Sequence, residues 1–216
     1  MINELSRFPA PGAEPLGLAF DGPTFWISSR EAHRLYALDP ATQTITEEIQ
    51  TPGAPFGIAV VGNELRVVIG FGDDDDDRYI YRFVRGHGFK NDRIACPDLS
   101  GVHLAFDGET LFLSQAHNMR ILALDHHGGV TRVIRLERRP LGMTIIDGVF
   151  YLVTGDEDFK DLQFAKVDAR HETPRVTSLA SIPFEARALA FDGARFWTGH
   201  RDANEIVAFA MPLTAK

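Results

Sequence analysis

The chain of 216 residues contains a single cysteine, Cys96, so no disulfide can form within it. A lone cysteine agrees with a reducing compartment. No apolar run approaches the roughly 18 residues that a membrane-spanning helix requires. The opening stretch, MINELSRFPAPG, lacks the basic region and the apolar stretch of a secretory signal. We therefore expect a cytoplasmic protein with no membrane partner, unless a signal peptide has already been removed.

Basic residues are fewer than acidic ones. The chain has 22 Lys and Arg against 30 Asp and Glu, a formal net charge of -8. Nucleic acids and anionic lipids bind to clustered Lys and Arg, so the charge balance disfavours both. The basic stretch at 78–90 directly follows five aspartates, which favours local neutralisation. The partner that we expect is a small molecule or another protein, and the sequence leaves the oligomeric state open.

Common catalytic signatures are missing as well. There is no GxSxG elbow, the segment HETPR (171–175) is not HExxH, and GFGDDD (70–75) is not GxGxxG. Cys96 precedes a proline, and no neighbouring feature would lower its pKa, so we interpret it as a packing residue. The motifs therefore require no cofactor and indicate no particular reaction.

The chain does contain a repeat. The pentapeptide LAFDG occurs at 18–22, 104–108 and 189–193. Around it a looser hexapeptide occurs five times: PLGLAF (15–20), PFGIAV (55–60), GVHLAF (101–106), PLGMTI (140–145) and ARALAF (186–191). The period of about 40 to 47 residues is typical of propeller blades or of helical-pair solenoids. Each unit is rich in Val, Ile and aromatic residues with frequent turn signals, which favours strands.

The repeat predicts an all-β fold, a five-bladed β-propeller of four-stranded antiparallel blades. The first unit shows four strand patterns, at 16–20, 24–28, 34–38 and 44–49. The fifth unit lacks its fourth strand, and a spare strand at 2–8 would complete that blade and close the ring. We expect one domain, 1–216, with blades at 15–50, 54–97, 101–137, 140–182 and 186–212. An open solenoid or a sandwich of the same strands is the alternative.

The predicted ring sorts the polar residues onto one face. The innermost strand of each blade should line a central channel, where small residues are expected: Gly17, Gly57, Gly142 and Ala188. His103 occupies the same position in the third blade, and Arg187 lies just before it in the fifth. A buried histidine needs a hydrogen-bond partner. Either His103 plugs the channel against a carbonyl, or it faces a ligand together with Arg187, which could bind a carboxylate or a phosphate.

Loop residues on the same face form a second group of candidates. Glu31, His117 and Asp202 align at one position of the loop between the second and third strands of a blade, and His200 aligns at another. Arg30 lies in the same loop of the first blade. Two carboxylates and an imidazole at a channel mouth could bind a divalent metal or transfer protons. Solvated loop residues are the alternative.

Two acidic loops are candidate calcium sites. The first runs through Asp73 and Asp75, and the second through Asp156 and Asp158. Calcium prefers six to eight oxygen ligands. The first loop departs from the EF-hand pattern, because Arg78 replaces the glycine that the pattern requires. Ca²⁺ or Mg²⁺ is thus a candidate ligand of these loops, and a solvated acidic loop is the alternative.

The blade pattern PLGLAFDG, FWIS and RLYALDP resembles the propellers of the SMP-30/gluconolactonase, virginiamycin B lyase and NHL-repeat groups. The resemblance covers nearly the whole chain and rests on blade-building residues, so it implies fold more than function. Gluconolactonases bind a divalent cation at the channel mouth, but the matching positions here are mostly Gly, Leu or Ala. For the magnesium site of the lyase, His103 and His117 are the nearest matches. No stretch resembles the signature segments of five-bladed glutaminyl cyclases.

The sequence is compatible with two kinds of function. The leading hypothesis is a non-catalytic binding propeller that holds a small molecule or a partner protein at the channel mouth, as many NHL-type propellers do. The alternative is a divalent-metal-dependent hydrolase or lyase that uses the same face.

Overall fold

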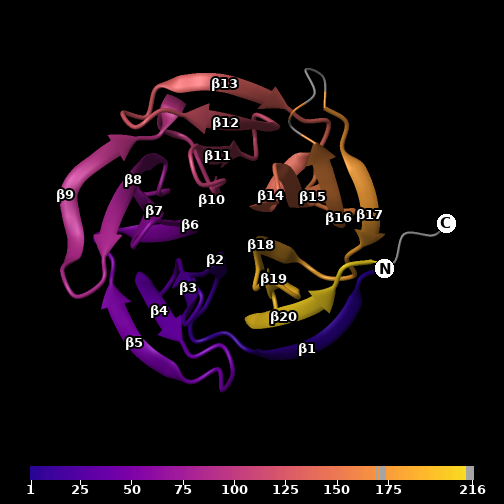
Figure 1. The fold of residues 1–216 in the computed structure, drawn as a ribbon, viewed down its shortest axis with the longest axis horizontal. Coiled ribbons are helices and arrows are strands. Elements are labelled where there is room, and N and C mark those ends of the chain that lie inside the picture. Colours follow the sequence, from indigo (N-terminus) through magenta and orange to yellow (C-terminus); the bar gives the residue numbers. More distant parts are fainter. Residues whose placement is uncertain (169, 171–173, 213–216) are drawn as a thin grey trace.

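The computed structural model describes residues 1–168, 170 and 174–212. These residues form twenty strands and one short 3-10 helix at Pro97–Leu99. The strands make five four-stranded antiparallel sheets arranged around a central axis (Figure 1). The predicted five-bladed propeller is therefore confirmed. No helix in the described part of the chain has the length and apolar character to span a bilayer.

Within each blade the four strands are arranged in order from the axis to the rim. The innermost strands are β2 (Pro15–Phe20), β6 (Ala54–Val61), β10 (Leu104–Phe106), β14 (Arg139–Ile146) and β18 (Ala186–Phe191). The second strands are β3 (Phe25–Ser29), β7 (Glu64–Phe71), β11 (Leu111–Gln115), β15 (Val149–Gly155) and β19 (Phe196–His200). The third strands are β4 (Arg34–Leu38), β8 (Asp77–Val84), β12 (Arg120–Leu124), β16 (Gln163–Asp168) and β20 (Glu205–Ala210). The outermost strands are β5 (Ile45–Gln50), β9 (Gly88–Ala95), β13 (Val130–Arg135), β17 (Thr177–Ser181) and β1 (Asn3–Pro9).

The N-terminal strand closes the ring, as the sequence predicts. β1 pairs antiparallel with β20, from Asn3 opposite Ala210 to Pro9 opposite Glu205. In Figure 1 the indigo strand lies beside the yellow one at the rim. This pairing covers the edge that β20 would otherwise expose, and unpaired edges invite aggregation. Ile2, just before the strand, donates its N–H to the carbonyl of Ser181 at 2.9 Å and so contacts the fourth blade.

The LAFDG repeat forms the turn between the first and second strands of alternate blades. Its glycines, Gly22, Gly108 and Gly193, have φ values of 83°, 104° and 97°. Residues with a Cβ rarely adopt this region, which explains the glycine at the end of each pentapeptide. The aspartate before each glycine accepts hydrogen bonds from backbone N–H groups of the same turn. The pentapeptide is thus a turn motif as well as an inner strand.

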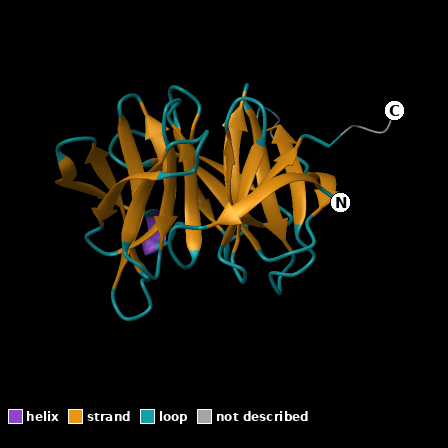
Figure 2. Cartoon of the chain, turned by 90° about the horizontal axis from the view of Figure 1, so that it is seen from below, coloured by secondary structure: helices purple, strands orange, loops and turns teal. Residues whose placement is uncertain are grey.

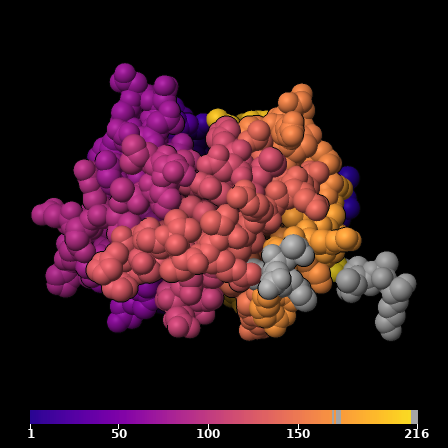
Figure 3. All heavy atoms as spheres, turned by 90° about the horizontal axis from the view of Figure 1, so that it is seen from above, coloured from indigo at the N-terminus to yellow at the C-terminus, as the bar shows by residue number. Residues whose placement is uncertain are grey.

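The apolar core lies between neighbouring blades. The buried side chains divide into five clusters, and each cluster lies mainly between two blades that are adjacent in the ring. Phe112 of the third blade meets Phe150 of the fourth edge to face, with ring centres 4.9 Å apart. Figure 3 shows the rim, where the second, third and fourth blades, magenta to orange, pack side by side in chain order. Loops project from both ends of the disc (Figure 2).

The third blade departs from the regular pattern at its innermost strand. The hexapeptide at 101–106 aligns with the other blades, yet β10 begins only at Leu104. The side chain of Ser114 explains the difference, because its Oγ accepts the backbone N–H of His103 at 3.0 Å. The main chain stays paired with Ser114, which accepts the N–H of Val102 and donates to the carbonyl of His103, so the strand bulges at this point.

Candidate functional site

A cavity of about 550 Å³ opens at one end of the channel. Its wall combines the starts of the innermost strands with the loops between second and third strands. We call it the mouth cavity. Its main apolar side chains are Leu16, Phe56, Val102, Pro140, Leu141 and Phe159. Its charged side chains are Glu14, Arg30, Arg78, Glu185, Arg187, Arg201 and Asp202, and His103 and His117 complete the polar wall.

The innermost strands crowd one another at the inner end of this cavity. A Cβ placed on Gly57 would lie 2.5 Å from Cα of His103, and one on Gly142 would lie 2.4 Å from the carbonyl oxygen of Ala188. Larger residues cannot occupy these positions without moving the backbone. Ala188 itself has a φ of 64°, unusual for a residue with a Cβ, where β18 bulges away from its ladder. His103 is therefore the one large side chain in this ring position among the five blades.

His103 is held in its neutral form. The residue is 3% exposed, and the carbonyl groups of Leu16 and Leu141 are the acceptors available to its ring. Burial lowers its pKa to about 3, and the positive charges of Arg187 and Arg78 act in the same direction. A neutral imidazole has one N–H, so it donates to only one of these carbonyls at a time.

Arg187 is anchored on the fifth blade. Its Nη2 lies 2.9 Å from Oε2 of Glu185, and its Nη1 donates to the carbonyl of Ala186 at 2.8 Å. Only 11% of its side chain is exposed, and this burial lowers its pKa. Its guanidinium carbon lies 6.0 Å from the centre of the Phe159 ring. Arg187 thus faces the cavity as the partner of a carboxylate.

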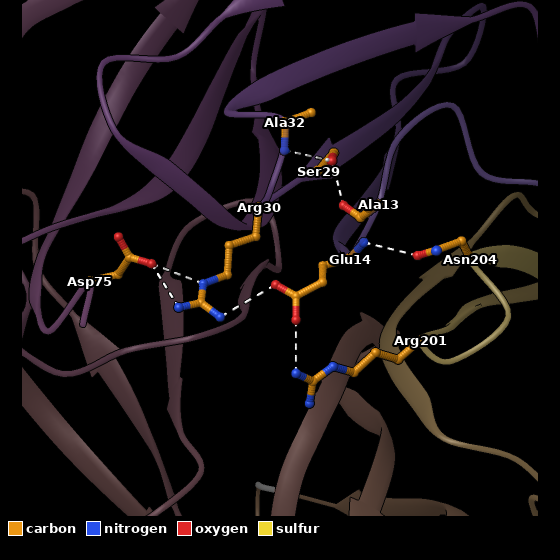
Figure 4. Close-up of polar contacts among 8 residues, drawn as sticks. All are labelled: Ala13, Glu14, Ser29, Arg30, Ala32, Asp75, Arg201 and Asn204. Atoms are coloured by element: carbon orange, nitrogen blue, oxygen red, sulfur yellow. Dashed lines mark hydrogen bonds and ion pairs between the residues drawn. The ribbon is translucent and has the colours of Figure 1, made fainter. Parts of the chain in front are cut away.

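A chain of ion pairs crosses three blades at the rim of the mouth cavity (Figure 4). Arg30 donates from Nε and Nη2 to Oδ2 of Asp75 at 3.0 and 2.7 Å. Its Nη1 lies 3.4 Å from Oε2 of Glu14. The other oxygen of Glu14 accepts a hydrogen bond from Arg201 at 2.8 Å. The chain therefore links the second, first and fifth blades through partly exposed charges.

Arg78 is one of several members of the site that the sequence pattern does not indicate, together with Glu14, Glu185 and Arg201. It stacks on Phe56, with its guanidinium carbon 4.0 Å from the ring centre. Its Nε donates to the carbonyl of Asp75 at 3.0 Å, and its Nη1 to the carbonyl of Gly101 at 2.8 Å. The sequence offers one faint signal, an arginine that immediately follows a run of aspartates. That signal favours local neutralisation and does not indicate burial.

The aligned loop residues divide between cavity and solvent. Asp202 and His117 are exposed and lie in the cavity wall. The ring of His117 meets Phe159 edge to face at 5.4 Å. Glu31 is exposed and lies outside the wall that the described residues form. His200 stacks on Phe184 at 4.6 Å, and its Nδ1 accepts the N–H of Ala203 at 3.3 Å. The structure thus brings two of these four together.

The candidate calcium ligands lie apart, in two loops. Asp75 binds Arg30, and Oδ1 of Asp156 accepts the N–H of Lys160 at 2.7 Å. Asp73 and Asp158 are exposed. Across residues 1–168, 170 and 174–212, no three His, Cys, Asp or Glu side chains form a group suited to a metal ion. Binding of Ca²⁺ or Mg²⁺ by these loops stays a prediction.

Comparisons with known proteins support the fold. No protein-family model matches the sequence, and no curated protein is a significant match. The structure of glutaminyl cyclase from Myxococcus xanthus superimposes with a TM-score of 0.75 at 13% identity, over 99% of this chain and 97% of that one. A calcium-binding protein, regucalcin, from Agrobacterium tumefaciens gives a TM-score of 0.60 at 12% identity, over 98% and 96%.

The predicted resemblance to the lyase propellers is confirmed at the level of structure. Virginiamycin B lyase from Staphylococcus aureus gives a TM-score of 0.56 at 16% identity, over 94% of this chain and 68% of that one. Identities this low indicate a shared fold, but they do not allow the roles of residues to be transferred. The chain is therefore similar in architecture to a cyclase, a lyase and a calcium-binding protein.

Proposed function

We propose that this propeller is a non-catalytic binding protein that holds a small molecule in the mouth cavity. The observation that carries the proposal is the cavity itself, about 550 Å³ at the end of the channel where ten chain connections converge. Pockets for small molecules usually measure about 300 to 1,000 Å³ and combine an apolar wall with a few fixed polar groups. Leu141 and Phe159 supply apolar wall, while His103 and Arg187 supply fixed polar groups.

Binding fits the polar groups better than catalysis does. A general acid or base needs a ring nitrogen free to exchange a proton with the substrate, with a pKa near the working pH. His103 has carbonyl partners at Leu16 and Leu141, and its pKa lies far below neutrality. It is therefore suited to shape the cavity and to offer fixed polarity.

The metal-dependent hydrolase or lyase has less support. Glu14 and Glu185, two of the three carboxylates in the cavity wall, are engaged in ion pairs with Arg201 and Arg187. A metal ion would have to displace arginine from both. A stoichiometric divalent ion in the purified protein, together with hydrolase or lyase turnover, would favour the alternative.

A blocked cavity tests the proposal. We would screen a mixture of neutral and charged fragments by saturation-transfer NMR against the wild type and two variants. Val102→Trp would fill the mouth cavity, whereas Val60→Trp places the same side chain at the opposite end of the channel. Fragments should bind the wild type and Val60→Trp, and should lose binding to Val102→Trp. If Val102→Trp keeps the wild-type set of fragments, or if no fragment binds the wild type, the proposal is wrong.

A further inference from the structure

One arginine in the mouth cavity has no carboxylate bound to it. Four arginines lie in the cavity wall, and Arg30, Arg187 and Arg201 each form ion pairs with a nearby carboxylate. Arg78 forms none with the residues that the structure describes, and its two hydrogen bonds go to the carbonyls of Asp75 and Gly101. Its charge is buried enough that desolvation lowers its pKa.

The free end of Arg78 faces the cavity. Its two hydrogen bonds use Nε and Nη1, so neither occupies Nη2. Among the described residues no fully buried side-chain nitrogen or oxygen lacks a partner. Nη2 must therefore reach solvent, and the mouth cavity is the space that Arg78 lines. The aromatic ring of Phe56, 4.0 Å from the guanidinium carbon, fixes the plane of this donor group.

The charge of Arg78 is compensated only from a distance. The carboxylates of Asp76 and Asp75 act on it through space, and that of Asp75 is bound by Arg30. A partly buried cation without a bound counter-ion costs free energy, which an anion at the open side would offset. Guanidinium N–H groups form strong, directional bonds with carboxylates.

We propose that the ligand of the mouth cavity is a monocarboxylate with an apolar body, whose carboxylate binds to Nη2 of Arg78. This inference rests on the proposed function and adds the class of ligand. A single acidic group matches the single arginine without an ion pair. Glu14, Glu185 and Asp202 in the same wall would repel a second negative charge. The apolar body would pack on Leu141 and Phe159 of the fourth blade, across the channel from Arg78.

Matched probes and a matched variant test this assignment. The probes are 4-phenylbutyrate and its neutral amide, 4-phenylbutyramide, titrated by calorimetry into the full chain. The variants are Arg78→Met and Arg93→Met. Arg93 also stacks at 4.0 Å, on Tyr79, and lies outside the mouth cavity. The wild type should bind the acid about tenfold or more tightly than the amide, because hydrogen bonds to a charged group are worth that much.

Arg78→Met should abolish this preference and keep amide binding, whereas Arg93→Met should keep the preference. Equal affinities of acid and amide in the wild type would overturn the inference, as would an Arg78→Met protein that still prefers the acid. The wild-type comparison decides the question even if Arg78→Met does not fold. If fragments bind in the mouth cavity but neither probe binds, the ligand class is wrong and the proposed function stands. If no fragment binds, the proposed function fails first.

Discussion

The indole Nε1 of Trp197 donates a hydrogen bond to Oδ2 of Asp192 at 2.8 Å. Trp26 makes the same bond to Asp21 at 2.9 Å in the first blade. Each aspartate belongs to an LAFDG repeat, and each tryptophan lies in the strand that follows. The aspartate thus holds the turn through its backbone N–H groups and also satisfies a buried indole. In the third blade Phe112 replaces the tryptophan, so Asp107 accepts hydrogen bonds only from the backbone N–H groups of its turn.

This difference predicts unequal costs for the same substitution. Asp192→Ala should lower the free energy of unfolding by about 1 to 3 kcal/mol more than Asp107→Ala, because it leaves the indole of Trp197 buried without an acceptor. Both variants lose the bonds to turn N–H groups, so the comparison isolates the two side-chain partners of Asp192, the indole of Trp197 and the partly exposed guanidinium of Arg195, which adds little. Urea unfolding followed by tryptophan fluorescence measures both. Equal losses would show that the indole bond adds nothing to stability.

Closure of the ring depends on Phe8 in β1. Its ring centre lies 6.5 Å from that of Phe25 and 6.1 Å from that of Trp197, so it packs between the first and fifth blades. Phe8→Ala should destabilise the protein by about 3 to 5 kcal/mol. Leu5→Ala in the same strand is the matched control, since Leu5 is 50% exposed, and it should change stability by less than about 0.5 kcal/mol. Similar losses in the two variants would contradict the packing role of β1.

His103 predicts a dependence of stability on pH. Its pKa is about 3 in the folded chain against 6.5 for a free side chain. Between these values the unfolded chain binds the extra proton, so stability falls as the pH drops from about 6.5 toward 3. The slope approaches about 1.4 kcal/mol per pH unit from this one group.

Denaturant unfolding at pH 7, 6 and 5 measures that slope. His103→Gln should remove the contribution of this group, leaving a shallower profile. His126→Gln, at an exposed position, should leave the slope unchanged. A His103→Gln profile parallel to that of the wild type would mean that the ring is not held neutral.

The architecture could be predicted because a blade is a local pattern. The position of LAFDG marks the inner strand and its turn, and strands that follow one another along the chain pair in order. The missing fourth strand of the fifth unit, together with the spare strand at 2–8, was enough to predict the pairing of β1 with β20. Even the crowding at Gly57 and Gly142 follows from five strands that meet at one axis.

The candidate site could be predicted only in part, because its contacts join different blades. His103 and Arg187 stand out since each breaks a repeat position. Arg78 does not stand out in the sequence. Its position in the cavity depends on the carbonyl of Gly101, which belongs to the next blade, and on the ring of Phe56. Phe159 likewise lies in an acidic loop whose composition indicates exposure. Loop residues that turn inward leave no periodic signal.

The pairing of β1 with β20 also bears on synthesis of the protein. Ribosomes release the chain from its first residue, so Phe8 emerges long before Ile206, which lies opposite it in the ladder. Blades one to four can assemble while translation continues, whereas the first strand stays without its neighbour until the fifth blade has left the exit tunnel. Nascent chains that stall inside the fifth blade would therefore have an open ring, with β1 unpaired, and would become substrates for chaperones.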